Sequence, residues 1–477
     1  MRILMVASEA APFAKTGGLA DVTAALPRAL ARLGHAVDLV MPRYGGITIG
    51  EPIGRITVPL GRVVADAMVY AETQAGVRTV FLDHPGFYHR DGLYGADGAD
   101  YPDNPERFAY LSRGALEWAS GADVPYDVIH VHDWQAGLVP VFLREFTDTP
   151  AFRQAATIFT IHNLAYQGIF DASWLPRLGL SDSLMRVDAL EYWNQISLLK
   201  GGIMFSRALT TVSRRYAEEI QTPEFGNGFD GILRSRSADL VGIRNGIDDT
   251  VWDPTSDPHL PEAFDASCLE RKLASKRMVL ARFGLPVDDT TLQRPLIGLI
   301  SRLVDQKGFD LIAALRAQLP TLDASFVLLG TGDTRYEEFW LSLAARHPER
   351  IAAHIGFDEG TAHLIEGGAD LFLMPSRFEP CGLNQMYSLR YGTIPVVHAT
   401  GGLYDTVRDY DATTRSGTGF TFDEYSPDTL LRTLRRALEV FQDADAWRHM
   451  QLAGMREDFS WDASAREYVT MYQRGRP

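Results

Sequence analysis

Two cationic side chains stand five residues apart where an expected strand gives way to a helix. Arg302 follows the strand expected over Leu296–Ile300, and Lys307 opens the next helix. Arginine offers a bidentate fork and lysine a point charge, which together suit the oxygens of a diphosphate. Each charge-assisted hydrogen bond would contribute roughly 1.5–3 kcal/mol. The pair predicts a phosphate-binding site, and the alternative is two ordinary surface cations at a strand end.

A carboxylate follows another expected strand of the same half. Glu379 lies between Pro375 and Pro380, in a loop after the strand expected over Leu371–Met374. Carboxylates in such loops bind sugar hydroxyls or stabilise positive charge that develops at a reacting carbon. A helix-capping role is the alternative for Glu379. Cys381 is expected to be a small core residue rather than a nucleophile, because no histidine is nearby in the sequence.

Paired glycines occur at two expected helix starts. Gly17 and Gly18 follow Lys15 and precede the helix expected over Leu19–Arg32, and Gly401–Gly402 begins a helix in the second half. Glycine lets the backbone approach a ligand closely, and the free N–H groups of a helix start favour anionic oxygens. Both turns are therefore candidates for binding an anion. An ordinary turn with a solvated lysine remains the alternative at Lys15.

Three histidines fall at the ends of two expected neighbouring strands. His130 and His132 are two residues apart and so share one face of a strand, and His162 ends the next strand. Three imidazoles would be enough to hold a catalytic metal, so a metal-dependent hydrolase is one hypothesis. Hydrogen bonding to a sugar and burial in the core are the other two.

Two short motifs are discounted. Gly226–Gly231 matches GxGxxG, but it follows Pro223 instead of a strand, so we expect a flexible loop and no dinucleotide site. The D-x-D pairs Asp409–Asp411 and Asp443–Asp445 do not follow an evident strand either. Both are expected to be solvated surface.

The candidate residues are positioned by strands that alternate with amphipathic helices, a pattern typical of parallel α/β sheets. The first series of expected strands is Ile3–Ala7, Val37–Met41, Val77–Leu82, Val128–Val131, Thr157–Ile161 and Leu209–Val212. The second series is Leu296–Ile300, Phe326–Leu329, Ile351–Ile355, Leu371–Met374, Pro395–His398 and Gly419–Phe422. We predict an α/β protein with two doubly wound, Rossmann-like domains that face a cleft, where ligands bind at the carboxyl ends of the strands.

A Pro- and Asp-rich stretch separates the two series. We therefore place one domain at 1–243 and a second at 244–457. The segment Thr16–Val22 is echoed by Thr400–Val407, which favours two related halves, although chance similarity would also explain so short a match. Apolar residues at 461, 465, 468, 469 and 472 predict a final helix within 458–477 that packs on one of the domains.

Composition narrows the classes of function. The 477 residues include 46 Lys+Arg and 61 Asp+Glu, a formal charge of −15, so nucleic acid and anionic membrane surfaces are poor partners. No apolar run approaches the ~20 residues that cross a bilayer, and the N-terminal run is too short for a signal peptide. The two cysteines, Cys268 and Cys381, favour a reducing compartment and therefore the cytoplasm.

Several of these segments together resemble one family. Lys15–Val22 is similar to a signature of bacterial glycogen synthases and plant starch synthases. The likeness continues, in the family's order, through His130–Trp134, His162–Gly168, Arg244–Asp248, Ser301–Leu303, Gln306–Gly308, Pro375–Gly382 and Thr400–Leu403. These segments extend over almost the whole chain, so the resemblance is far more specific than any one motif.

The resemblance implies a GT-B glycosyltransferase that needs no metal and no cofactor. Its donor would be ADP-glucose, its acceptor the non-reducing end of an α-1,4-glucan such as glycogen, and the anomeric configuration would be retained. The final helix would cross back to the first domain. Whether the chain forms a homo-oligomer stays open.

The resemblance also implies roles for individual residues. Arg302 and Lys307 would hold the diphosphate, and Glu379 would contact the donor sugar. His162 and Asp133 would line the glucose site. Further substrate-binding positions would be Lys15, Gly17, Gly18, Asn245 at the hinge, Phe357 stacked on the base, Cys381, Gly382, Leu383, Thr400, Gly401 and Gly402.

One position departs from the wider pattern of retaining transferases, which has two glutamates separated by seven residues. The second position is Tyr387 here, so no role for a second glutamate is expected. Two alternatives to the synthase stay open besides the hydrolase. One is a transferase that uses UDP-glucose. The other is a catalytically silent glucan- or nucleotide-binding protein, which the presence of Arg302, Lys307 and Glu379 disfavours.

Overall fold

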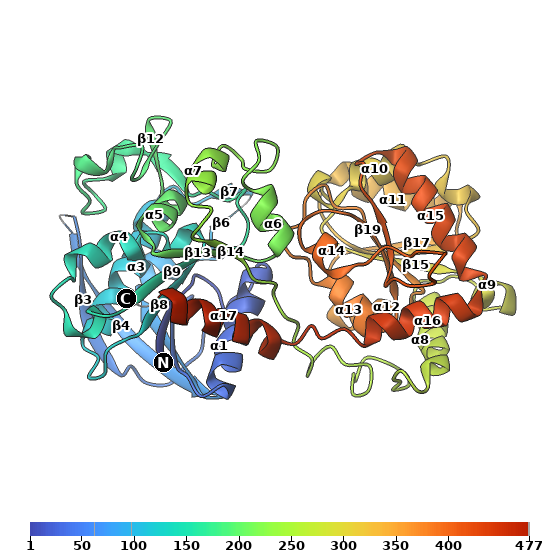
Figure 1. Cartoon of the computed structure of the whole chain (residues 1–477), viewed down its shortest axis with the longest axis horizontal. Coiled ribbons are helices and arrows are strands. Elements are labelled where there is room, and N and C mark those ends of the chain that lie inside the picture. The colour runs from blue at the N-terminus through green and yellow to red at the C-terminus, as the bar shows by residue number, and fades with distance from the viewer. Residues whose placement is uncertain (62, 97, 476–477) are drawn as a thin grey trace. The chain divides into compact units, whose positions relative to one another are not determined.

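The chain folds into two units in a computed structural model that describes residues 1–61, 63–96 and 98–475. Unit 1 comprises Met1–Val212, Ala217–Gly246 and the segment from Trp461 onward, and unit 2 comprises Ser213–Tyr216 and Ile247–Ser460. Each unit is a sheet with helices around it (Figure 1). Among the described residues, no helix combines the length and the apolar character that crossing a bilayer requires.

The main sheet of unit 1 has the order β14-β13-β9-β8-β1-β2-β5-β4-β3. Its strands are β1 (Arg2–Val6), β2 (Ala36–Pro42), β3 (Gly54–Leu60), β4 (Val63–Gln74), β5 (Val77–Asp83), β8 (Val128–His132), β9 (Ala156–Ile161), β13 (Ala208–Thr211) and β14 (Leu240–Gly242). Pairing is parallel from β14 to β5, and every residue of the central strand β8 is buried. Burial on both faces explains why these strands are recognisable in the sequence as continuous apolar runs.

Two strands at one edge differ from the prediction. β3 and β4 pair antiparallel with each other, and β4 pairs antiparallel with β5. In β3, Val58 and Leu60 are buried while Arg55 and Pro59 are exposed. Helix α3 (Asn104–Ser120) packs against the inner face of this strand. The pair is not predicted from the sequence because such alternation lacks the continuous apolar run of a buried parallel strand.

The other helices in this part of the chain are α1 (Gly18–Arg32), α2 (Pro85–Tyr88), α4 (Val139–Phe142), α5 (Leu198–Phe205), α6 (Arg214–Glu219) and α7 (Asp230–Ser235). Short antiparallel ribbons are formed by β6 (Gly95–Ala96) with β7 (Ala99–Asp100), and by β10 (Ile169–Asp171), β12 (Gln195–Ser197) and β11 (Glu191–Tyr192) in the order β10-β12-β11. The segment expected to be a flexible loop is a turn that leads into α7, and its backbone is hydrogen-bonded to Gln167 and Tyr192.

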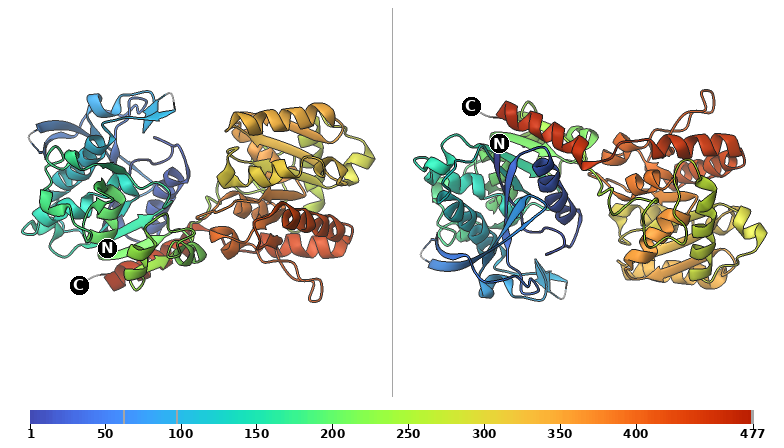
Figure 2. Two further views of the ribbon diagram at one scale, coloured as in Figure 1. Left: turned by 90° about the horizontal axis from the view of Figure 1, so that it is seen from above. Right: turned by 90° about the horizontal axis from the view of Figure 1, so that it is seen from below.

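The last helix of the chain belongs to unit 1. The apolar stripe that begins at position 461 lies on α17 (Trp461–Gly475), where Trp461, Ala465, Tyr468 and Tyr472 are buried. α17 packs beside α1 and against β9, as the view from below in Figure 2 shows for α1. Arg32 on α1 forms an ion pair with Asp462 at 2.6 Å. Deeper in the unit, the Tyr472 hydroxyl hydrogen-bonds Nδ1 of His130 at 2.7 Å.

Unit 2 contains a six-stranded sheet in the order β17-β16-β15-β18-β19-β20, with parallel pairing throughout. Its strands are β15 (Leu296–Ile300), β16 (Ser325–Gly330), β17 (Ile351–Ile355), β18 (Leu371–Met374), β19 (Ile394–His398) and β20 (Phe420–Phe422). Its helices are α8 (Lys272–Arg282), α9 (Asp289–Gln293), α10 (Phe309–Ala314), α11 (Thr334–Arg346), α12 (Glu359–Gly368), α13 (Asn384–Arg390), α14 (Gly401–Thr406), α15 (Pro427–Phe441) and α16 (Ala444–Met455). Three of these strands have the predicted bounds.

Successive residues of each strand in unit 2 point to two different cores. Phe326 and Leu328 belong to the cluster that contains Trp340 of α11, while Val327 and Leu329 belong to the cluster that contains Ile365 of α12. Side chains alternate across a strand, so helices must cover both faces of the sheet. The carboxyl edge of the sheet is left as the place where polar side chains can gather.

Short 3₁₀ turns occur at Trp134–Ala136, Leu143–Glu145, Pro150–Phe152, Ala172–Trp174, Asp182–Leu184, Leu269–Arg271, Asp305–Lys307 and Leu319–Thr321. The turn at Asp305–Lys307 links β15 to α10 and carries a candidate site residue. The turn at Trp134–Ala136 directly follows β8 and Asp133.

Replacing Tyr472 with phenylalanine should lower the free energy of unfolding by about 1–3 kcal/mol, because the substitution leaves a buried nitrogen of His130 without its hydrogen-bond partner. Urea denaturation of the two proteins measures the difference. Tyr166→Phe is the matched control in unit 1, since that side chain is largely exposed, and it should leave the urea midpoint unchanged. Equal midpoints for Tyr472→Phe and the wild type would contradict the prediction.

Candidate functional site

A lysine and a glutamate from distant parts of the sequence form an ion pair in unit 2. Nζ of Lys307 donates to Oε2 of Glu379 at 2.6 Å, and the Ser376 hydroxyl donates to the same oxygen at 3.0 Å. Glu379 is only 5% exposed, so these two donors offset the cost of burying its charge. The alternative role of helix capping does not hold, because α13 begins at Asn384 and Glu379 accepts from side chains instead.

Neighbouring strands bring these residues together. β15 and β18 pair in parallel, so the loops that follow them leave the same edge of the sheet. Arg302 follows β15 directly, and Lys307 ends the 3₁₀ turn after it. The Arg302 side chain is exposed, and within the described residues its guanidinium forms no ion pair and no hydrogen bond. Arg302 is therefore available to a ligand, whereas Lys307 already holds Glu379.

The glycine pair at the start of α14 packs directly on the loop that carries Glu379. Gly402 N–H donates to the Glu379 carbonyl oxygen at 3.0 Å. A Cβ at Gly401 would lie 1.9 Å from that oxygen, and a Cβ at Gly402 would lie 1.9 Å from the carbonyl oxygen of Cys381. The φ of Gly401, +44°, also disfavours any side chain. Only glycine permits this close approach, which fixes the backbone on either side of Glu379.

The remaining predicted residues of unit 2 lie around this arrangement. Cys381 is buried, in agreement with its prediction as a core residue, and Leu383 precedes the first turn of α13. Phe357 follows the edge strand β17 and is 81% exposed. No aromatic ring among the described residues stacks on Phe357, so its ring is free to stack on a planar ligand.

In unit 1, the ends of β8 and β9 bring Asp133 and His162 together. The backbone N–H of His162 donates to Oδ1 of Asp133 at 2.7 Å. Asp133 has φ +56° and ψ −178°, a conformation almost restricted to glycine. Such strain costs of order 1–3 kcal/mol and clusters at functional sites. Burial raises the pKa of the Asp133 carboxyl to about 7, although the backbone N–H groups of His162 and Asn163 oppose the shift.

The three histidines take part in two separate sets of hydrogen bonds and are not arranged as a metal-ligand set. His130 uses both ring nitrogens, Nδ1 with Tyr472 at 2.7 Å and Nε2 with the Thr160 hydroxyl at 2.6 Å. His132 Nδ1 and His162 Nε2 are 3.0 Å apart and share a hydrogen bond. Among the described residues, no three His, Cys, Asp or Glu side chains are grouped to hold a metal. The hydrolase hypothesis therefore loses its metal site.

Burial keeps these imidazoles neutral. It lowers the pKa of His130 and His162 to about 3, and it lowers the pKa of His132 well below its ordinary value, in each case because a charged ring would lose its hydration. A neutral imidazole has one donor and one acceptor nitrogen. His162 engages His132 through Nε2, so its Nδ1 remains for a ligand.

The turn that begins α1 is held by a residue that is not predicted from the sequence. Glu9 is buried and accepts hydrogen bonds from the backbone N–H of Thr16, from the Thr16 hydroxyl at 2.7 Å and from the Tyr94 hydroxyl. Gly17 then caps α1, while Lys15 is exposed and pairs with Asp21 at 2.6 Å. A carboxylate directly after the first apolar run was the available signal for Glu9.

Asn245 lies close to the end of the segment Ala217–Gly246 of unit 1 and is 6% exposed. Its Oδ1 is buried and has no hydrogen-bond partner among the described residues. Buried polar atoms are nearly always paired, so an orphaned oxygen is typical of a position that a ligand completes. Six of the predicted site residues thus belong to unit 1, namely Lys15, Gly17, Gly18, Asp133, His162 and Asn245, and the others belong to unit 2.

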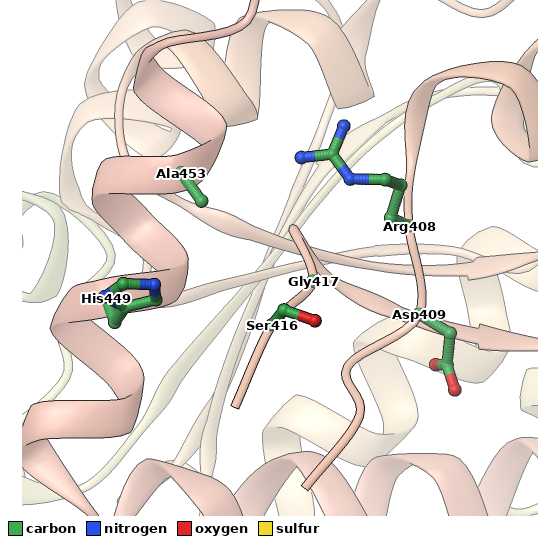
Figure 3. A pocket seen from close by; sticks show the side chains of 6 residues that line it. All are labelled: Arg408, Asp409, Ser416, Gly417, His449 and Ala453. Carbon is green, nitrogen blue, oxygen red and sulfur yellow. The ribbon is translucent and has the colours of Figure 1, made fainter. Parts of the chain in front are cut away.

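A pocket elsewhere in unit 2 is not lined by any of the candidate residues. It has a volume of about 240 Å³ and is lined by Arg408, Asp409, Ser416, Gly417, His449 and Ala453. Figure 3 shows Arg408 and Asp409 pointing in different directions. Arg408 pairs with Glu457 at 2.7 Å, and Asp409 pairs with Arg436. Its charges are thus satisfied within the protein, which fits the expectation that Asp409 is surface and not a metal ligand.

Comparison with known proteins agrees with this geometry. Residues 2–235 match the starch synthase catalytic domain family, and residues 288–449 match the glycosyl transferases group 1. The catalytic domain of starch synthase IV from Arabidopsis thaliana, bound to ADP and acarbose, superposes with a TM-score of 0.90 at 34% identity over 99% of both chains. Sucrose-phosphate synthase from Thermosynechococcus elongatus shares the fold, with a TM-score of 0.60 at 18% identity over 99% of this chain and 98% of that one.

Curated relatives match over the whole length. Glycogen synthase of Anaeromyxobacter dehalogenans (strain 2CP-C) is 52% identical over 99% of both chains. Glycogen synthase of Koribacter versatilis is 46% identical over 100% of this chain and 98% of its own. The fold and these matches therefore define a glycosyltransferase of the GT-B class. More narrowly, the chain belongs to the family of bacterial glycogen synthases and plant starch synthases.

Acidification from pH 7 to pH 5 should destabilise unit 1. Each buried histidine stays neutral in the folded state while the unfolded chain takes up a proton below about pH 6.5, which costs about 2 kcal/mol per histidine at pH 5. Asp133 opposes this effect, because its raised pKa makes the folded state bind a proton first. The destabilisation caused by the three histidines is larger than the stabilisation that Asp133 provides.

Urea denaturation at pH 7 and pH 5 measures this loss of stability. In His130→Gln the loss should be smaller by about 2 kcal/mol, the contribution of one histidine. His354→Gln is the control, because that side chain is exposed in unit 2 and the loss should stay as in the wild type. If His130→Gln lost as much stability between pH 7 and pH 5 as the wild type, the prediction would be wrong.

Gly401→Ala should destabilise unit 2 by about 2–4 kcal/mol and abolish transferase activity. The new methyl group meets the Glu379 carbonyl oxygen and forces a left-handed alanine, so the loop that carries Glu379 must shift. Thermal unfolding and activity assays measure both effects. Gly231→Ala is the matched control, because its Cβ would have 3.9 Å of clearance within α7, and a stable and active Gly401→Ala protein would contradict the prediction.

Proposed function

We propose that this enzyme transfers glucose from ADP-glucose to the non-reducing end of an α-1,4-glucan, with retention at the anomeric carbon. The observation that carries the proposal is the arrangement at the carboxyl edge of the second sheet. There Arg302 has no partner among the described residues, and Lys307 forms an ion pair with Glu379. The relatives named glycogen synthase support the reaction. The ADP bound by the Arabidopsis starch synthase supports the nucleotide.

The cations would act on the leaving group. Departure of ADP from glucose increases the negative charge on the diphosphate, so the Arg302 guanidinium and the Lys307 ammonium would bind the transition state more tightly than the ground state. An ammonium has three donors. Lys307 uses one of them for Oε2 of Glu379 and keeps two for phosphate oxygens.

Glu379 would position the donor sugar. Its Oε2 accepts from Lys307 and Ser376, and within the described residues Oε1 accepts no hydrogen bond. Oε1 is therefore the oxygen that would accept from a sugar hydroxyl. The packing of Gly401 on the Glu379 carbonyl holds this carboxylate in place, which matters because small displacements of reacting groups reduce rates strongly.

In unit 1, Asp133, His162 and Asn245 would bind glucose hydroxyls. Within the described residues, Nδ1 of His162 and the buried Oδ1 of Asn245 have no hydrogen-bond partner, and the Asp133 carboxyl lies beside His162. A neutral imidazole beside a carboxyl with a pKa of about 7 suits binding to uncharged hydroxyls. Lys15 and Gly17–Gly18 are proposed to assist at the start of α1, together with Thr400 and Gly382 in unit 2.

The base of the donor is the least constrained part of the proposal. The exposed ring of Phe357 would stack on adenine, but an aromatic ring stacks on uracil equally well in principle. A UDP-glucose-dependent synthase is therefore the second candidate. The ADP-bound structure from Arabidopsis favours the adenine nucleotide.

The compartment follows from the same proposal. The substrates are a nucleotide sugar and a storage glucan. Among the described residues, neither Cys268 nor Cys381 forms a disulfide, as is usual in a reducing compartment. We place the enzyme in the cytoplasm, acting on glycogen.

Arg302→Ala should lower the rate of glucose transfer by about 10²–10³, the usual loss when one group that stabilises transition-state charge is removed. The assay follows labelled glucose from ADP-glucose, and separately from UDP-glucose, into a glycogen primer with EDTA present. Arg316→Ala is the matched control, an exposed arginine of the same unit that lies outside the site, and it should retain full activity.

Each outcome of the assay is decisive. Incorporation from ADP-glucose alone supports the proposal, and equal incorporation from UDP-glucose replaces it with the second candidate. Binding of ADP-glucose without incorporation would move the protein to the silent binders. An Arg302→Ala enzyme as active as Arg316→Ala would contradict the role given to the guanidinium.

A further inference from the structure

An exposed tryptophan lies at the tip of a hairpin in unit 1, outside the site described above. β11 and β12 pair with Tyr192 opposite Gln195, so Trp193 and Asn194 form a two-residue turn. Their φ angles are +52° and +63°, both in the left-handed region. Turns of this kind favour asparagine and glycine, and a tryptophan in the first position is strained. Its side chain is nevertheless 80% exposed, so folding gains little from it.

The backbone below Trp193 is firmly held. The Tyr192 ring stacks on Phe229 with centroids 4.7 Å apart, and its hydroxyl donates to the Asn227 carbonyl oxygen at 3.2 Å. Asn194 N–H donates to Oε1 of Glu191 at 2.9 Å, and Lys200 Nζ donates to the Glu191 carbonyl oxygen. The hairpin is thus a pre-organised support for the indole.

The indole itself is largely uncovered, since Trp193 is 80% exposed. Among the described residues no other aromatic ring contacts Trp193, so the faces of the indole remain open to solvent. A strained and exposed aromatic side chain on a firmly held hairpin is typical of a binding position and not of a core.

The surroundings indicate the kind of ligand. Asn194 and Gln195 are exposed beside the indole, and Glu191 is half-buried below it. A flat apolar face with amide groups at its edge matches a pyranose ring, whose C–H face is apolar and whose rim carries hydroxyls. One indole is too small for a protein interface, which buries about 800 Å² on each partner. The patch therefore favours a sugar over a second copy of this chain.

We propose that Trp193 is a surface platform on which one glucose ring of a long α-glucan stacks, in addition to the residues assigned to the glucose site. The inference rests on the proposed function in one respect, because only a polymeric acceptor contains both the reacting end and further glucose units. A polymer held at Trp193 has a higher effective concentration of chain ends near the enzyme. Short maltooligosaccharides gain nothing from the platform.

Trp193→Gly tests the proposal. Glycine accepts the left-handed turn without strain, so the variant should fold with an unchanged or higher melting temperature. Native gels that contain glycogen measure the apparent affinity from the retardation of the protein. This affinity should fall about three- to tenfold, the loss expected for one aromatic contact. KM for glycogen should rise by the same factor, while kcat, KM for ADP-glucose and KM for maltotriose should not change.

Two further variants serve as controls. Trp193→Phe keeps an aromatic face and should retain most of the wild-type affinity for glycogen. Ile53→Ser removes an apolar side chain of unit 1 that is 59% exposed and lies outside the hairpin, and it should bind glycogen like the wild type.

The outcomes separate this inference from the proposed function. Gel retardation requires no turnover, so a wild type that binds glycogen through Trp193 but transfers no glucose would leave the platform standing and overturn the synthase. If glucose transfer is normal and glycogen retards Trp193→Gly as strongly as the wild type, the platform is overturned and the synthase stands. It would also be overturned if Trp193→Gly raised KM for maltotriose and glycogen alike, or changed the oligomeric state instead of glycogen binding.

Discussion

Parallel strand pairing is the constraint on which both groups of candidate residues depend. In a parallel sheet every strand ends at the same edge, and helices cover both faces, so side chains that must meet a ligand have only that edge available. β15 and β18 deliver Lys307 and Glu379 to one point in unit 2. β8 and β9 deliver Asp133 and His162 to another in unit 1. The chemistry of the enzyme therefore follows from the pairing of two strands in each unit.

The two groups of residues are stabilised in different ways. In unit 2 the charge of Glu379 is compensated by Lys307 and Ser376, and the glycines of α14 let two loops touch backbone to backbone. Losing Lys307 would leave the buried charge of Glu379 without its ion-pair partner, which is costly. In unit 1 there is no such ion pair between Asp133 and His162. Burial instead removes charge, so that the histidines are neutral and the Asp133 carboxyl titrates near neutrality.

These features destabilise unit 1 locally, and the end of the chain offsets part of that cost. The left-handed backbone of Asp133 is strained, and neutral histidines must find hydrogen-bond partners in the core. α17 supplies one of them, since Tyr472 bonds His130, which lies two residues before His132 on the same strand. The last helix of the sequence thus completes the support behind a site formed by residues more than 300 positions earlier in the chain.

The sequence by itself determined the elements and the types of residue. Runs such as Leu296–Ile300 are recognisable because a strand buried on both faces must be apolar throughout, and the positions of Arg302, Lys307 and Glu379 after such strands predicted anion and sugar chemistry. β3 and β4 were not predictable in this way, because their alternating pattern depends on which face the rest of the unit covers. Only the tertiary structure decided that Lys307 lies 2.6 Å from Glu379, that Glu9 holds Thr16 and that Trp193 remains exposed. The reason is physical: periodicity and composition are local properties of a chain, whereas the order of strands in a sheet joins segments that no local pattern relates.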